Sequence, residues 1–112
     1  MKQERQIKYI KDKLVSTIQP EKIILFGSHL TDKSNRDSDI DLLIIINDSN
    51  YMASMKRYDR ELQVSNLFYP RLFAIDNLVY TSGEIQNLSE SNEGEWDLVL
   101  EILGEGKILY ER

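Results

Sequence analysis

A short apolar run, Leu42–Ile46, constrains the fold of this chain more than any other segment. Five apolar residues in a row, three of them isoleucines, favour a strand that is covered on both faces, and such strands lie inside a sheet. Two carboxylates, Asp39 and Asp41, stand directly before the run with Ile40 between them. Successive side chains of a strand point to opposite faces, so these carboxylates share one face at the start of a predicted strand over 39–46.

A second apolar run, Ile23–Phe26, is followed at once by Gly27 and Ser28. It predicts a strand over 22–26 that ends in a tight turn. The ten residues between Ser28 and Asp39 are too few for a full crossover helix, so we expect the two strands to pair antiparallel. Backbone N–H groups and a hydroxyl at such a turn can bind phosphate, and paired carboxylates attract Mg²⁺. A phosphate cradle beside metal ligands is typical of phosphoryl or nucleotidyl transfer.

Hydrophobic spacing predicts the remaining elements. They are helices over 3–18 and 51–67, short helices over 28–33 and 84–88, a strand over 72–80, a final helix that begins near Trp96, and an edge strand over 107–110. These elements favour an α+β fold, a small mixed sheet with helices packed on one face. At this length we expect one domain spanning 1–112.

Composition narrows the classes of function. The chain has no cysteine, which excludes disulfides and thiolate chemistry and fits a cytoplasmic protein. A net charge of −5 argues against direct, sequence-independent binding of nucleic acid, which depends on many Lys and Arg. The sequence contains neither an apolar run long enough to cross a bilayer nor a secretory signal, so we expect no membrane attachment.

The order Gly27-Ser28, ten residues, Asp39-Ile40-Asp41 resembles the signature of the polymerase β-type nucleotidyltransferase superfamily. The version Ser38–Leu42 on so short a chain is similar to that of its minimal nucleotidyltransferases. The segment 75–81 resembles the strand of the third family carboxylate, here Asp76, and 104–111 resembles the usual C-terminal ending. A carboxylate in such an apolar strand also needs a partner, and a metal ion supplies one.

The resemblance implies a polymerase β-like fold, two Mg²⁺ ions and ATP as substrate. It implies that Asp39, Asp41 and Asp76 are the catalytic metal ligands, with Asp76 nearest the attacking hydroxyl. Gly27 and Ser28 would contact the phosphates. In the spacer, many members carry arginines and a glycine, whereas this chain has His29, Asp32 and Asn35, with Lys33 and Arg36 beside them.

The resemblance also implies a partner. Minimal nucleotidyltransferases are often encoded beside a small helical HEPN protein, a ribonuclease toxin. The transferase acts as the antitoxin by moving AMP from ATP onto a toxin tyrosine. We therefore expect a Mg²⁺-dependent protein adenylyltransferase, the antitoxin of a type VII-like toxin–antitoxin pair, in a hetero-oligomer with its toxin. Two alternatives stay open: a small-molecule transferase, for instance acting on an aminoglycoside, and a non-catalytic antitoxin that neutralises by binding.

Overall fold

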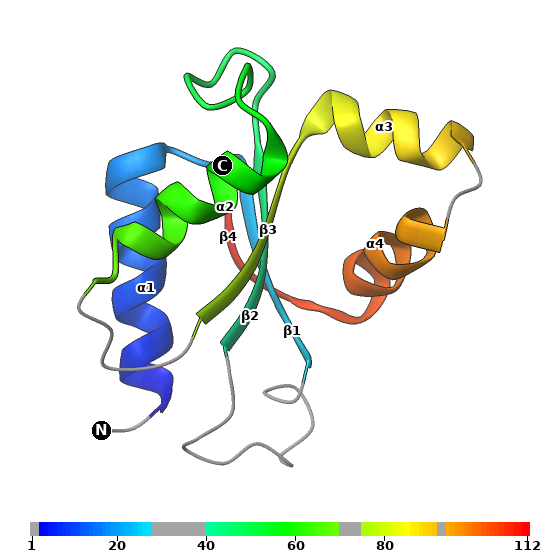
Figure 1. Cartoon of the computed structure of the whole chain (residues 1–112). Helices are drawn as coiled ribbons and strands as arrows, with labels where there is room; N and C mark the ends of the chain where they lie inside the picture. Colours follow the sequence, from blue (N-terminus) through cyan, green and yellow to red (C-terminus); the bar gives the residue numbers. More distant parts are fainter. Residues whose placement is uncertain (1–2, 28–39, 70–74, 92–93) are drawn as a thin grey trace.

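The computed structural model describes residues 3–27, 40–69, 75–91 and 94–112. Within these ranges four helices and four strands form an α+β fold (Figure 1). In chain order they are α1 (Gln3–Ile18), β1 (Lys22–Phe26), β2 (Ile40–Ile46), α2 (Arg57–Asn66), β3 (Ile75–Thr81), α3 (Ser82–Ser91), α4 (Gly94–Glu105) and β4 (Lys107–Glu111). The predicted helix over 28–33 and the start of the strand predicted from residue 72 lie outside the described residues.

The strands form one mixed sheet in the order β3-β2-β1-β4. β1 pairs antiparallel with β2 and with β4, and β2 pairs parallel with β3. The short connection between β1 and β2 had predicted their antiparallel pairing. β2 therefore has a neighbour on each side, and its residues Leu42–Ile46 are all buried. The prediction of an interior strand from this apolar run is therefore confirmed.

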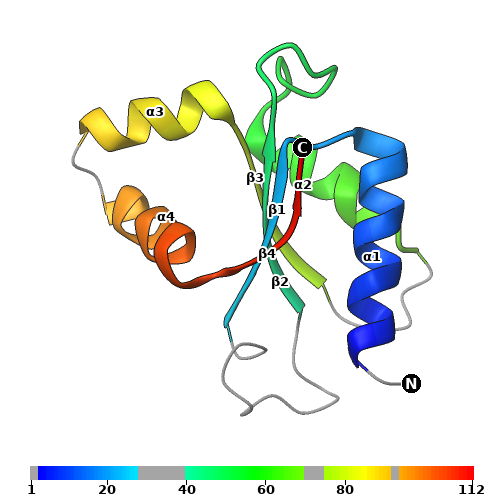
Figure 2. The same cartoon turned by 180° about the vertical axis from the view of Figure 1, so that it is seen from behind.

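The helices cover both faces of the sheet and not one face, so that part of the prediction was wrong. Figures 1 and 2 show α1 and α2 on one side of the strands and α3 and α4 on the other. The reason lies in β2, whose side chains are apolar on both faces and must be covered on both. Helices α3 and α4 supply the second cover, through Ile85, Leu88, Val99 and Ile102.

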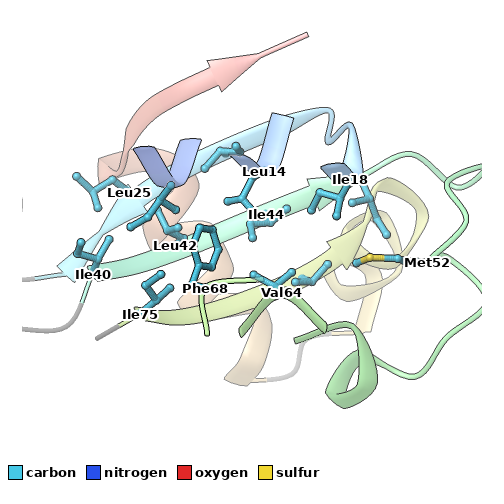
Figure 3. Packing of buried hydrophobic residues seen from close by; sticks show 14 residues of the cluster. Leu14, Ile18, Leu25, Ile40, Leu42, Ile44, Met52, Val64, Phe68 and Ile75 are labelled. Carbon is cyan, nitrogen blue, oxygen red and sulfur yellow. The ribbon is translucent and has the colours of Figure 1, made fainter. Parts of the chain in front are cut away.

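The larger core lies between the sheet and the pair α1 and α2 (Figure 3). Ile10, Leu14 and Ile18 are spaced by four residues and bury one stripe of α1. They pack with inward residues of the strands, among them Leu42 and Ile44. The same spacing predicted this helix from the sequence, and α1 has the predicted bounds.

The helix predicted over 51–67 is shorter in the structure, because turns precede α2. The side chain of Asn50 accepts a hydrogen bond from the Met52 backbone N–H at 2.9 Å and donates one to the Ile18 carbonyl at 2.8 Å. Such side-chain bonds compete with helix formation. Met52 is nevertheless buried in the larger core. Of the helices in the described ranges, none has both the length and the apolar character needed to cross a membrane.

Candidate active site

Three strands bring the predicted site residues to one end of the sheet. Asp41 stands opposite Phe26 of β1 on one side and opposite Asp76 of β3 on the other. Neighbouring strands lie about 4.8 Å apart, so the two carboxylates are adjacent although they are distant in the sequence. By alternation they share a face with Leu43 and Leu78, which belong to the core under α3 and α4. This is the lower end of the sheet in Figure 1.

Gly27 continues β1 directly against Asp41. Its φ is +83°, a region that side-chain-bearing residues rarely adopt. A Cβ built on Gly27 would lie 2.2 Å from Asp41 Oδ2, closer than any real contact. The site therefore requires glycine here for two independent reasons, and the carboxylate of Asp41 rests on bare backbone.

Asp41 is half-buried and Asp76 is exposed, so the pair opens toward solvent. Two neighbouring carboxylates repel each other unless a cation lies between or beside them. Within the described ranges, no group of three or more acidic, His or Cys side chains is arranged to hold a metal ion. Other residues of the predicted site and spacer lie outside the described residues: Ser28, His29, Asp32, Lys33, Asn35, Arg36 and Asp39.

Helix α2 supports the strand that carries Asp76. Glu61 of α2 accepts a hydrogen bond from the Val79 N–H at 3.2 Å, on the outer edge of β3. Burial raises the pKa of Glu61, and the negative charge of Asp76 contributes to the increase. Asn77, which follows Asp76, donates to the Glu61 carbonyl at 3.4 Å and to Ser65 Oγ at 3.3 Å. Its Oδ1 is buried without a hydrogen-bond partner among the described residues.

A buried arginine, Arg60, joins this edge of the sheet to α3. It is 2% exposed and donates to the carbonyls of Met52 (3.0 Å), Ala53 (3.0 Å) and Val79 (3.2 Å). It also binds both carboxylate oxygens of Glu84, at 2.6 and 3.1 Å. Together with Glu61, Arg60 satisfies the backbone of Val79 at the sheet edge, where a further strand would otherwise pair.

Sequence reasoning missed this support, although part of its signal is visible. Thr81-Ser-Gly-Glu84 is a capping box in which the Glu84 N–H donates to Thr81 Oγ1 at 3.0 Å and the Thr81 N–H donates to Glu84 Oε1 at 2.8 Å. That motif would have placed the start of α3 at Ser82 rather than at the predicted Glu84. Arg60 gives no comparable signal, because its partners come from distant segments.

Comparison with known proteins shows the family of this chain. A family model described as "Polymerase beta, Nucleotidyltransferase" matches residues 8–112. The chain belongs to this nucleotidyltransferase family. The matched range spans all four strands as well as Gly27, Asp41 and Asp76, and the family fold agrees with the mixed sheet of the structure. The polymerase β-like α+β fold expected from the sequence is therefore confirmed.

Two solved structures resemble this member of the polymerase β nucleotidyltransferase family. A Sulfolobus solfataricus protein assigned as a nucleotidyltransferase is 25% identical, with a TM-score of 0.55 over 74% of this chain and 70% of that one. A toxin–antitoxin crystallised with AMP-PNP is 18% identical, with a TM-score of 0.54 over 94% of this chain and 73% of that one. The second likeness concerns the fold alone. No curated protein matches the sequence significantly.

Proposed function

We propose that this protein is a Mg²⁺-dependent adenylyltransferase that moves AMP from ATP onto the hydroxyl group of a tyrosine in a partner protein. The observation that carries the proposal is the pairing of Asp41 with Asp76 beside the bare backbone of Gly27. Membership of a nucleotidyltransferase family supports the reaction class. Asp39 would complete the ligand set, and Ser28 would contact a phosphate, as the family motif implies.

The donor set fits the metal. Adjacent carboxylates offer the hard oxygen ligands that Mg²⁺ prefers, and Asp41 and Asp76 present them on one face of the sheet. When bound, Mg²⁺ would lower the pKa of the attacking hydroxyl and neutralise charge on the triphosphate. Asp39, Asp41 and Asp76 would hold it.

The residues of the chain position the reactants. The backbone at Gly27 leaves room for a phosphate where a side chain would collide with Asp41. The tyrosine oxygen attacks the α-phosphorus of ATP and forms a new P–O bond, while the bond from that phosphorus to the β-phosphate oxygen breaks and pyrophosphate leaves. Asp76, exposed at the site, accepts the phenolic proton.

The partner is proposed on separate grounds. One solved structure of the same fold is a toxin–antitoxin crystallised with AMP-PNP, a non-hydrolysable ATP analogue. The resemblance to minimal nucleotidyltransferases points to a helical HEPN toxin in that role. In such a pair the toxin supplies the acceptor hydroxyl. We propose that this chain acts as the antitoxin and that residues 1–112 form a single domain.

Label transfer tests the proposal. The purified chain and the protein encoded by the adjoining gene are incubated with Mg²⁺ and each nucleoside triphosphate labelled at the α-phosphate. We expect label on the adjoining protein from ATP. The variants Asp39→Asn/Asp41→Asn and Asp76→Asn should lose it, whereas Asp59→Asn, on the exposed surface of α2, should transfer label normally.

The same experiment separates the alternatives. A complex that forms and neutralises the partner without label would identify an antitoxin that acts by contact. Label on an added aminoglycoside, and on no protein, would identify a small-molecule transferase. Either result would refute the transfer of AMP to a protein.

A further inference from the structure

The segment from the start of α3 to the turn after α4, residues 82–106, differs in charge from the rest of the chain. It contains seven acidic residues and neither Lys nor Arg, a formal charge of −7. All 14 basic residues lie elsewhere, with the remaining 12 of the 19 acidic residues, a charge of +2. The net −5 of the protein therefore comes entirely from this segment, on the face of the sheet that α3 and α4 cover (Figure 2).

Helix α4 also leaves apolar side chains uncovered. Val99 and Ile102 face the core, but Leu100 is 52% exposed and Leu103 is 36% exposed. Three residues apart, the two leucines lie on the same side of the helix. Beside them, a Cβ on Gly104 would meet nothing within 4 Å, so bare helix backbone is accessible. A helical glycine costs stability relative to alanine, and exposed leucines gain nothing in the isolated protein.

Acidic residues adjoin these leucines. Asp97 and Glu101 are exposed and lie three residues before and one residue after Leu100. With Gly104 they follow the spacing of one helix side. We call Asp97, Leu100, Glu101, Leu103 and Gly104 the α4 surface. An apolar patch with a charged border is typical of a protein interface.

The α4 surface belongs to the helix layer above the candidate site. Asp41 and Asp76 point to the sheet face that α3 and α4 cover, because they alternate with the residues packed under those helices. Both views of the fold show α4 nearer than α3 to the sheet end where β2 and β3 begin (Figures 1 and 2). A protein bound to α4 would therefore lie on the same face of the sheet as the carboxylate pair, toward the end that carries it.

We propose that the α4 surface docks the protein acceptor, at a place where apolar side chains of the acceptor are bordered by Lys and Arg. The inference rests on the proposed function, since it takes the bound partner to be the protein that is modified. A segment with a charge of −7 repels nucleic-acid phosphates and anionic lipids and attracts a basic protein surface. Leu100 and Leu103 supply the apolar contact, and Gly104 allows close approach of the backbone.

Binding to the purified protein of the adjoining gene tests the docking surface, with affinity measured by calorimetry. We expect Leu100→Gln/Leu103→Gln to weaken binding at least tenfold. Asp97→Asn/Glu101→Gln should lower the association rate and its dependence on salt. The control is Leu62→Gln, a leucine 48% exposed on α2 across the sheet, which should bind within twofold of the unchanged protein. Melting temperatures of all variants establish that they fold.

Binding and label transfer fail separately. The Asp39→Asn/Asp41→Asn variant should bind like the unchanged protein, and a complex that depends on Leu100 and Leu103 but carries no label would refute only the proposed function. Unchanged affinity after both leucine substitutions would refute the docking surface, as would the absence of any complex. A dimer of this chain that the leucine substitutions dissociate, with partner binding intact, would show that a second copy covers α4.

Discussion

At the scale of single residues, the candidate site depends on one glycine and two carboxylates held by backbone pairing. Asp41 and Asp76 are register partners on parallel strands, and Gly27 touches Asp41 from the other side. Each of these positions was predicted from the sequence as a site residue. Their roles in metal and phosphate binding stay predictions, whereas their convergence at one end of the sheet is a property of the structure.

Gly27→Ala should disturb both fold and site. Its positive φ and the 2.2 Å approach of a Cβ to Asp41 Oδ2 leave no room for alanine. We expect a loss of about 2 kcal/mol in the free energy of unfolding and a loss of label transfer of tenfold or more. Urea unfolding and the transfer assay measure the two effects. For comparison, Gly104→Ala meets no neighbouring atom and should raise stability by up to about 1 kcal/mol. Equal effects of the two substitutions would contradict this account.

The ionised carboxylate of Glu84 should contribute to the free energy of unfolding, and this contribution should be lost at acid pH. Burial raises its pKa, but the hydrogen bonds and charge of Arg60 and the capping bonds of Thr81 outweigh burial and bring the pKa below its ordinary 4.5. A carboxyl with a lowered folded-state pKa stabilises the fold above its unfolded-state pKa, and this stability is lost as the pH falls through the folded-state value. We therefore expect Glu84→Gln to destabilise the protein at pH 7, and the difference to shrink below about pH 4.5.

Chemical unfolding of both proteins between pH 3 and 7 measures that difference. A gap that stays constant over the whole range would show that the charge of Glu84 contributes nothing, and that only the shape of the capping box matters.

At the scale of elements, side chains of α2 form the hydrogen bonds to β3 that an additional strand at this edge would otherwise form. Glu61 accepts a hydrogen bond from the Val79 N–H and Arg60 donates one to the Val79 carbonyl. Side chains of α2 therefore satisfy both backbone groups of Val79 at the sheet edge. Arg60 continues to Glu84 at the start of α3. The strand that carries Asp76 is thus held between β2 and a helix, which keeps its beginning in register with Asp41.

Arg60→Met should remove this connection. It removes the arginine as donor to three backbone carbonyls and to the Glu84 carboxylate, at a position where the arginine is 2% exposed. We expect a loss of about 3 kcal/mol in the free energy of unfolding. Arg57→Met on the same helix is the matched control. Arg57 contacts the Tyr80 ring and hydroxyl and Glu61 but is partly exposed, so its loss should cost about 1 kcal/mol or less. If the two substitutions cost a similar free energy of unfolding, Arg60 would not be a special connection between β3 and α3.

At the scale of the whole molecule, the two faces of the sheet differ in what they carry. The face under α1 and α2 holds the larger core, and the face under α3 and α4 carries both the carboxylate pair and the acidic segment. Stability and binding are therefore coupled through the strands, and a ligand at the site should stabilise the entire fold by mass action.

ATP with Mg²⁺ should raise the melting temperature. A ligand at a hundredfold excess over its Kd stabilises by about 2.7 kcal/mol, and EDTA should abolish the shift if the metal connects the nucleotide to the carboxylates. Asp41→Asn/Asp76→Asn should show no shift with ATP and Mg²⁺, because the variant lacks two of the proposed metal ligands. Differential scanning calorimetry decides the matter, and an equal shift in that variant would contradict metal binding by these residues.

The sequence by itself determined which residues can face one another within an element. The apolar run Leu42–Ile46 implied an interior strand, and the period of two placed Asp41 on a defined face. The period of α1 implied its buried stripe. Gly27 marked the end of the strand before it, and β1 ends at Phe26. All these signals are local, because the geometry of one strand, helix or turn fixes them without reference to the rest of the chain.

Only the tertiary structure decided what lies beside what. Parallel pairing of β2 with β3 makes Asp76 the neighbour of Asp41, and no periodicity within either strand specifies that register. The second helix layer exists because both faces of β2 need cover, but its identity as α3 and α4 follows from the path of the chain. Arg60 is buried only because carbonyls and a carboxylate from three segments meet around it. Such contacts join residues far apart in the sequence, and their energy depends on the packing of the whole molecule.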